Sequence, residues 1–287
     1  MPKPKRSGSG PEMAGPTTVP ANGAAIPALG LGTWQLRGDD CSAAVKTALA
    51  AGYRHIDTAA MYGNEEAVGA GLKASRIGRD EVFVTTKVWY EDLAPADLRR
   101  SAEASLRRLD LSFVDLLLIH WPNSRLPLAP SIRALCAAKR TGLARHVGVA
   151  NFTVQLLDEA MAAADEPIAA NQCEYHPYLD QRAVLSACRR HGVAFISYCP
   201  LGKAQVLGEP AIQAIATTHG RTPAQIVLRW HLQQGVAAIP KSGNPRRIAE
   251  NFAVFDFELA EDEMARIAGL ARPGGRMVAP SWSPAWD

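Results

Sequence analysis

The chain has 287 residues, of which 47% are hydrophobic and 21% are charged, and its formal net charge is +3. A chain of this length and composition can bury a large core, either as one barrel or as two ordinary domains. The low net charge argues against a nucleic-acid partner, and no apolar run reaches the roughly 18 residues that a membrane span requires.

The first residues are basic and are followed by Gly, Ser and Pro rather than by the apolar core of a signal peptide. We expect residues 1–15 to be a disordered tail or an expression remnant, and residues 16–287 to form one domain. The five cysteines include no C-x-x-C pair. Reduced, buried thiols in a cytoplasmic protein are therefore expected in preference to disulfides.

Residues 19–27 have the pattern of two short strands joined by a turn. Asn22-Gly23 lies at the centre of this stretch, and Asn-Gly favours the positive φ angles of a tight hairpin. We expect the hairpin to plug one end of the fold. Residues 28–32 predict a first buried strand, which leads into Thr33-Trp34.

Helical and strand-like patterns then alternate as far as residue 252. Amphipathic periodicity, with stops such as Gly52, predicts the helices, and short apolar runs predict the strands. The predicted helices are 41–51, 64–74, 96–109, 130–139, 153–163, 180–191, 210–219, 223–234 and 245–252. The predicted strands after the first are 54–57, 82–87, 114–119, 146–149, 168–173, 193–198 and 236–239.

This alternation predicts an α/β fold, a closed (β/α)8 TIM-type barrel. An open doubly wound sheet of this length would usually have fewer strands or a second domain. Right-handed crossovers place the carboxyl ends of all the strands at one face, where barrels keep their active sites. Residues 272–287 contain three prolines and two tryptophans without a helical period. We expect this segment to be a tail over the barrel mouth.

Polar side chains follow the predicted strands at that face: Asp57, Lys87, His120, Asn151, Gln172, Tyr198 and Lys241. Tyr62 lies about one helical turn after Asp57. Taken singly, each has an ordinary structural explanation, such as a helix cap, a packed aromatic or a satisfied core histidine. Together they can donate a proton at neutral pH, because an ammonium beside a phenol stabilises the phenolate that donation leaves.

Several stretches carry motifs at a consistent spacing: residues 30–34 (GLGTW), 52–65 (GYRHIDTAAMYGNE), 86–89 (TKVW), 115–122 (DLLLIHWP), 148–152 (GVANF), 171–177 (NQCEYHP), 239–242 (IPKS) and 247–251 (RIAEN). On these motifs the chain resembles an aldo-keto reductase, of the kind found as single-domain bacterial carbonyl reductases. The resemblance covers residues 16–270 in order.

The resemblance implies NADPH-dependent reduction of aldehydes or ketones to alcohols, and the reverse oxidation, by direct hydride transfer. The implied roles are general acid for Tyr62, cationic neighbour for Lys87, carboxylate holding that lysine for Asp57, and substrate-orienting group for His120. The residues expected to line the substrate pocket are Trp34, Trp89 and Trp121.

The resemblance also implies a set of cofactor contacts. The nicotinamide would meet Asn151 and Gln172 at its carboxamide and Tyr198 at its ring, with further cofactor contacts from Gly32, Thr33 and Leu201. The 2′-phosphate is assigned to Lys241, Ser242 and Arg247, and the adenine to Glu250 and Asn251. Ala150 stands where the family commonly has Ser, so one expected hydroxyl bond to the carboxamide is missing.

The segment after the last predicted strand favours NADPH over NADH. Basic residues at the start of the helix from Pro245 oppose its macrodipole unless an anion compensates, and a phosphate dianion would do so. No H-E-x-x-H or comparable set indicates a metal. Gly69-x-Gly71 superficially matches a dinucleotide motif, but it lies inside a predicted helix and indicates helix packing instead.

Two other functions remain open at this point. The chain could be a non-catalytic NADP-binding regulatory or sensor barrel, although the intact catalytic residues argue against it. It could also be a metal-free isomerase that forms a Schiff base on Lys87, which borohydride trapping would detect. For the reductase we expect a small-molecule carbonyl or alcohol substrate, no nucleic-acid or membrane partner, and a monomer.

Overall fold

The computed structural model describes residues 18–287, so the prediction for residues 1–15 lies outside the described residues. Eight parallel strands form one sheet in the order in which they occur in the chain. They are β3 (Leu31–Gly32), β4 (His55–Asp57), β5 (Phe83–Val88), β6 (Val114–Ile119), β7 (Ala144–Ala150), β8 (Ile168–Glu174), β9 (Ala194–Tyr198) and β10 (Ala237–Ala238).

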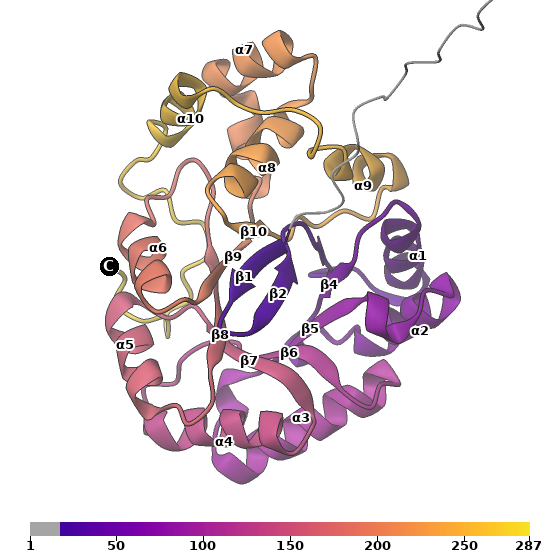
Figure 1. Ribbon diagram of the computed structural model, residues 1–287, viewed down its shortest axis with the longest axis vertical. Coiled ribbons are helices and arrows are strands. Elements are labelled where there is room, and N and C mark those ends of the chain that lie inside the picture. Colours follow the sequence, from indigo (N-terminus) through magenta and orange to yellow (C-terminus); the bar gives the residue numbers. More distant parts are fainter. Residues whose placement is uncertain (1–17) are drawn as a thin grey trace, which may run out of the picture.

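Helices lie outside the curled sheet and surround it (Figure 1). They are α1 (Gly38–Ala50), α2 (Glu65–Ser75), α3 (Pro95–Leu109), α4 (Leu128–Arg140), α5 (Val154–Ala163), α6 (Arg182–Arg190), α7 (Pro210–His219), α8 (Pro223–Gln233), α9 (Pro245–Phe252) and α10 (Glu261–Ala268). Within residues 18–287, no helix combines the length and the apolar character needed to cross a membrane.

The first and last strands of the sheet approach each other. The backbone N–H of Gly30 donates to the carbonyl of Ala238 at 2.9 Å, and that of Gly32 donates to the carbonyl of Pro240 at 3.0 Å. Any Cβ on Gly32 would lie 2.7 Å from the Ile239 carbonyl oxygen, so only glycine allows this approach. The curled sheet of eight parallel strands is consistent with a TIM-type barrel.

The predicted hairpin consists of β1 (Thr18–Ala21) and β2 (Ala24–Pro27), which pair antiparallel. Asn22 and Gly23 in the turn have φ angles of 40° and 88°, as a tight turn of this kind requires. Buried hairpin residues such as Ile26 form one apolar cluster with sheet residues such as Leu116 and Ile196. Figure 1 shows the hairpin crossing the centre of the ring of strands.

A second, larger core fills the layer between the sheet and the helices. Leu117 and Ile119 of β6 belong to it, whereas Leu116 and Leu118 belong to the interior cluster, so this strand is covered on both faces. The glycines of α2 allow close helix packing, as predicted. A Cβ on Gly69 would lie 2.4 Å from the carbonyl oxygen of Leu109 in α3, so a larger residue would not fit there.

Most predicted elements are confirmed, and β6 and α9 have the predicted bounds. Helix α10 was not predicted from the sequence, because its exposed surface is mostly charged and only Glu263 and Ile267 are buried. The last strand, predicted over 236–239, is shorter as β10. All five cysteine thiols are free, and four of them are buried.

Candidate active site

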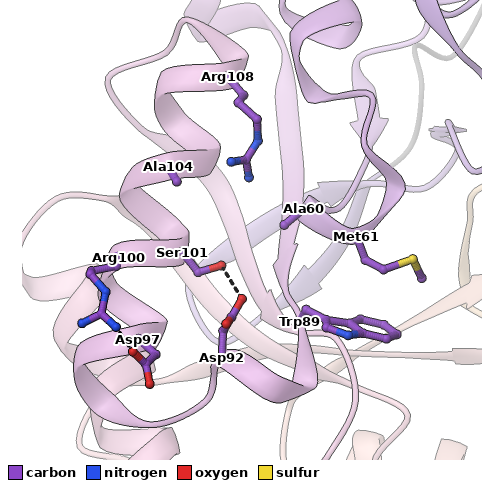
Figure 2. Close-up of a pocket in the computed structure, with 9 residues that line it drawn as sticks. All are labelled: Ala60, Met61, Trp89, Asp92, Asp97, Arg100, Ser101, Ala104 and Arg108. Atoms are coloured by element: carbon purple, nitrogen blue, oxygen red, sulfur yellow. Dashed lines mark hydrogen bonds and ion pairs between the residues drawn. The ribbon is translucent and has the colours of Figure 1, made fainter.

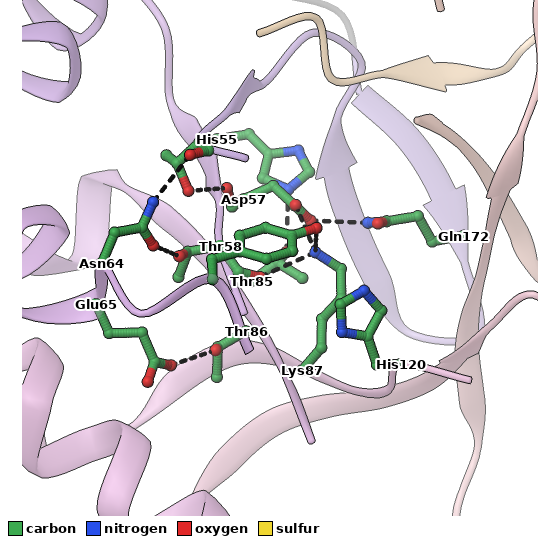
Figure 3. Close-up of polar contacts among 12 residues, drawn as sticks. His55, Asp57, Thr58, Asn64, Glu65, Thr85, Thr86, Lys87, His120 and Gln172 are labelled. Carbon is green, nitrogen blue, oxygen red and sulfur yellow. Dashed lines mark hydrogen bonds and ion pairs between the residues drawn. The ribbon is translucent and has the colours of Figure 1, made fainter. Parts of the chain in front are cut away.

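The polar residues predicted at the strand ends gather at the carboxyl edge of the sheet. Asp57 ends β4, Lys87 lies near the end of β5, and His120 directly follows β6. Tyr62 ends the short 3-10 helix Ala60–Tyr62 that follows β4. Figure 3 shows the side chains of Asp57, Lys87, His120 and Gln172 converging.

The Lys87 ammonium is the centre of this cluster and is completely buried. It donates to Asp57 Oδ1 at 2.5 Å, to the carbonyl of Thr58 at 2.9 Å and to the Tyr62 hydroxyl at 3.4 Å. Burial acts to lower the pKa of Lys87, but the Asp57 carboxylate and the Tyr62 hydroxyl outweigh it, so the pKa lies above its ordinary value. Lys87 is therefore a fixed cation.

The second oxygen of the Asp57 carboxylate has a partner that the sequence analysis did not find. Gln172 Nε2 donates to Asp57 Oδ2 at 2.7 Å. Gln172 belongs to β8, four places from β4 in the sheet, so this bond spans the interior of the curled sheet. Each carboxylate oxygen is thus satisfied by a different group, as a buried carboxylate requires.

Tyr62 carries the only hydroxyl among the four predicted catalytic residues, Asp57, Tyr62, Lys87 and His120. Burial raises the pKa of Tyr62, and the Lys87 ammonium opposes this rise without cancelling it. The phenol is therefore protonated at neutral pH. Its ring lies 4.9 Å from the Trp34 ring and 5.6 Å from the His120 ring, measured between centroids.

His120 is buried and neutral at pH 7. Burial and, after it, the positive charge of Lys87 hold the pKa of His120 well below its ordinary value. Within residues 18–287, its Nδ1 atom is buried without a hydrogen-bond partner. Neutral imidazole has one donor and one acceptor nitrogen, so His120 can still bind a polar group of a ligand.

A cavity of about 1210 Å³ opens beside Tyr62 and His120. The predicted site residues that line it are Gly32, Thr33, Trp34, Asp57, Tyr62, His120, Trp121, Asn151, Gln172, Tyr198, Leu201, Lys241, Ser242, Arg247, Glu250 and Asn251. Lys87 lies beneath this surface. The cavity also has lining residues that the sequence analysis missed, among them Leu207, Gln213, Met277 and Val278.

The side-chain amides in the cavity already have protein partners. Asn151 Nδ2 donates to the His120 carbonyl at 2.9 Å, and the Tyr198 hydroxyl donates to Asn151 Oδ1 at 2.8 Å. A primary amide has two N–H donors and two acceptor lone pairs. Asn151 and Gln172 therefore retain capacity for a ligand while their orientation is fixed by the protein.

The far end of the cavity is basic and lies at the start of α9. Asn244 caps this helix by accepting from the Arg247 backbone N–H at 3.1 Å. The Arg246 guanidinium forms an ion pair with Glu250, with Nε and Oε1 2.7 Å apart. In the part of the chain that the structure describes, the side chains of Lys241 and Arg247 make no ion pair, and both line the cavity. This end suits a phosphate group.

Trp89 does not line the large cavity. It lines a separate groove of about 410 Å³ between α3 and the 3-10 helix 60–62, together with Met61, Asp92 and Arg108 (Figure 2). Its ring centroid lies 5.2 Å from that of His120 and 6.3 Å from that of Trp282. The Trp89 ring therefore packs against the His120 ring from outside the large cavity, and its role as a substrate contact stays a prediction.

The C-terminal segment reaches the same region. The Trp282 ring stacks on Tyr90 with centroids 5.4 Å apart, and the Trp286 ring lies 6.0 Å from Trp121. Tyr90 and Trp121 directly follow Trp89 and His120 in the chain, so the two tail aromatics lie close to the site.

Comparison with known proteins gives consistent matches. The family model described as "Aldo/keto reductase family" matches residues 28–272. An aldo-keto reductase of Mycobacterium sp. (strain MCS) is 44% identical over 261 residues, which are 90% of this chain and 92% of that protein. Methylglyoxal reductase DkgB of Escherichia coli O157:H7 is 40% identical over 92% of this chain and 100% of its own length.

Solved structures agree with these matches. The crystal structure of MGS-M4, an aldo-keto reductase from a Medee basin deep-sea metagenome library, superposes with a TM-score of 0.89. It is 36% identical and covers 94% of this chain and 99% of its own.

Proposed function

Because the chain belongs to the aldo/keto reductase family, we propose that it reduces aldehydes or ketones to alcohols with NADPH, and catalyses the reverse oxidation. It is an oxidoreductase that acts on carbonyl groups. The main support for this mechanism is a buried series of hydrogen bonds. It runs from Gln172 through Asp57 and Lys87 to the Tyr62 hydroxyl at the cavity.

Tyr62 is the general acid in this proposal. Reduction leaves negative charge on the carbonyl oxygen, and the Tyr62 hydroxyl donates its proton to that oxygen. The resulting phenolate would form 3.4 Å from the Lys87 ammonium, which stabilises it, while Asp57 keeps the ammonium charged and oriented. The raised pKa of Lys87 argues against a neutral amine for Schiff-base chemistry.

His120 orients the substrate in this proposal. Because it is neutral, its ring can donate one hydrogen bond to the carbonyl oxygen without competing as an acid with Tyr62. Trp34 and Trp121, which line the cavity beside Tyr62 and His120, supply an apolar wall for the rest of the substrate.

The residues present fit a nicotinamide dinucleotide phosphate. The cavity joins the fixed amides of Asn151 and Gln172 to the cationic side chains of Lys241 and Arg247, so one extended ligand can reach both ends. When bound, NADPH supplies the hydride. Tyr198 offers its ring for stacking, Gly32, Thr33 and Leu201 line the middle, and Ser242, Glu250 and Asn251 complete the end near α9.

The test of this function is a screen of aldehydes, ketones and keto-sugars with NADPH, followed by the absorbance of reduced nicotinamide. Consumption of NADPH with formation of the alcohol is expected. Tight NADP binding with no turnover of any carbonyl would instead support the regulatory or sensor alternative.

We expect Arg247→Ala to weaken NADPH binding while leaving NADH binding nearly unchanged. A charge-assisted contact to the 2′-phosphate has no counterpart in NADH, so its loss should cost about 1.5–3 kcal/mol for NADPH alone. Kd values for both cofactors measure this effect. Arg246→Ala is the matched control, because Arg246 neighbours Arg247 but pairs with Glu250. Equal weakening of both cofactors by Arg247→Ala would contradict the assignment.

We also infer the architecture around the site. The bonds of Gly30 and Gly32 to the last strand support closure into a full (β/α)8 barrel, and the hairpin plugs its amino-terminal end. The tail covers the mouth, and residues 16–287 act as one domain. Since a chain's own tail completes its cavity wall, we propose a monomer. The free thiols support a cytoplasmic location.

Deletion of residues 280–287 should change the KM values for carbonyl substrates more than the Kd for NADPH. It removes Trp282 and Trp286, whose rings contact Tyr90 and Trp121 beside His120. A panel of aromatic and alicyclic ketones and aldehydes would measure the change. If substrate preference stays the same, the tail does not form part of the pocket.

A further inference from the structure

A buried carboxylate outside the catalytic group holds the C-terminal segment. Glu174, the last residue of β8, is fully buried. Its Oε1 atom accepts from the Met277 backbone N–H at 2.6 Å and lies 2.9 Å from His176 Nε2. Its Oε2 atom accepts from the Val278 backbone N–H at 2.9 Å. Two consecutive backbone donors of the tail therefore converge on one side chain.

The tail approaches Glu174 along a tight path. The Arg272 backbone N–H donates to the Tyr178 carbonyl at 3.1 Å, and a Cβ on Gly275 would lie 1.9 Å from that carbonyl oxygen. The Lys203 ammonium adds a second contact, since it donates to the Met277 carbonyl at 3.0 Å. The Glu174 side chain is fully buried, whereas Lys203 is exposed, so the two bonds to Glu174 are better protected from water than the Lys203 contact.

The residues fixed at this point are part of the pocket. Met277 and Val278 line the large cavity. The Arg276 guanidinium lies over the Trp286 ring at 3.6 Å from its centroid, and Trp286 in turn contacts Trp121. The Glu174 carboxylate thus holds the tail directly before its aromatic part.

We propose that Glu174 is a positioning residue for the substrate, which fixes the C-terminal segment 276–287 through the Met277 and Val278 backbone and so controls which carbonyl compounds fit. This inference rests on the proposed reductase function. Glu174 does not line the cavity, and its effect on substrate passes entirely through the tail.

Glu174→Gln is the informative substitution because it keeps the size of the side chain. An amide has one acceptor oxygen, and its NH₂ group would face a backbone N–H of the tail or His176. At least one charge-assisted bond is then lost and one donor is left unpaired. We expect the fraction of molecules with a detached tail to rise about 10- to 100-fold.

Trypsin reports this detachment directly. After Arg266, the chain has only two trypsin-type residues, Arg272 and Arg276, and Arg272 is followed by Pro273, which blocks cleavage. The Arg276 side chain is 14% exposed in the folded protein. Cleavage after Arg276 should therefore be slow in the wild type and about tenfold or more faster in Glu174→Gln, with release of residues 277–287 seen by mass spectrometry.

Glu263→Gln is the matched control. Glu263 also accepts from a histidine, His219, and from a backbone N–H, that of Ala260, but neither partner belongs to the tail. Its substitution should leave the cleavage after Arg276 at the wild-type rate. Gly275→Ala should also detach the tail, because the added Cβ would force the tail away from the Tyr178 carbonyl.

Kinetics complete the test. Glu174→Gln should raise KM for a bulky aromatic aldehyde several-fold, as we also expect for deletion of the tail, while kcat for propanal and Kd for NADPH change little. Unchanged cleavage in both Glu174→Gln and Gly275→Ala would overturn the proposal, and so would faster cleavage with an unaltered KM pattern. Absence of any carbonyl turnover in the wild type would contradict the reductase function, whereas the cleavage result concerns the anchor alone.

Discussion

Replacing Tyr62 by phenylalanine should lower kcat for carbonyl reduction by about 10²–10⁴-fold, the usual contribution of a positioned acid. The ring, its contact with Trp34 and the Asp57–Lys87 pair remain, because the substitution removes only the hydroxyl. Kd for NADPH should therefore stay close to the wild-type value. Single-turnover rates with saturating NADPH separate the loss of proton donation from any slower product release.

The control for this variant is Tyr175→Phe, which removes another buried phenol whose hydroxyl bonds to Gln234 away from the cavity. It should keep wild-type kcat. If Tyr62→Phe turns over at the wild-type rate, another group donates the proton, and the proposed role of Tyr62 is wrong.

Replacing Lys87 by methionine should lower kcat at least as much as Tyr62→Phe, and it should also destabilise the fold. The phenolate loses its cation, and among residues 18–287 the buried Asp57 carboxylate keeps only Gln172 as a side-chain donor. Removing one partner of a buried ion pair typically costs roughly 3–5 kcal/mol of unfolding free energy. Urea unfolding and kcat should be measured on the same preparation.

The double variant Asp57→Asn/Lys87→Met distinguishes the two effects. It removes both charges, so most of the lost stability should return while kcat remains low. Adding Tyr62→Phe to Lys87→Met should cause little further loss, since residues that act as one unit are not additive. A Lys87→Met enzyme with an altered KM but wild-type kcat would show that the ammonium does not support proton transfer.

The sequence predicts the strand-end cluster well because parallel strands bring their carboxyl ends to one edge whatever their length. The periodicity of the strands and a short spacing are enough to predict that Asp57, Tyr62, Lys87 and His120 lie together. Contacts between residues on distant strands cannot be predicted in this way. Nothing local in β8 indicates that Gln172 bonds to Asp57, or that Glu174 accepts from Met277, since both contacts depend on how far the sheet curls and where the tail returns.

The position of the Trp89 ring could not be predicted from the sequence. A tryptophan just after a strand suggests a wall of the large cavity, but the Trp89 ring lines the groove beside α3 and packs against the His120 ring. Its role as a substrate contact stays a prediction. Helix α10 was not predicted, because its buried residues form only one narrow stripe. The mostly charged surface hides the helical periodicity of its apolar residues.

The bond between Gln172 and Asp57 also has a consequence for the order of folding. It joins residues 115 positions apart, and Asp57 lies in the first third of the chain. During synthesis, strands β4 and β5 can pair early, yet this carboxylate lacks its second donor until β8 has emerged and docked. Contacts of such long range form slowly, since loop closure precedes any gain from them. A nascent chain that ends before residue 172 can therefore pair Asp57 with Lys87 but lacks the Gln172 donor to Asp57. The hydrogen-bond network of the site is completed only when the second half of the chain has folded.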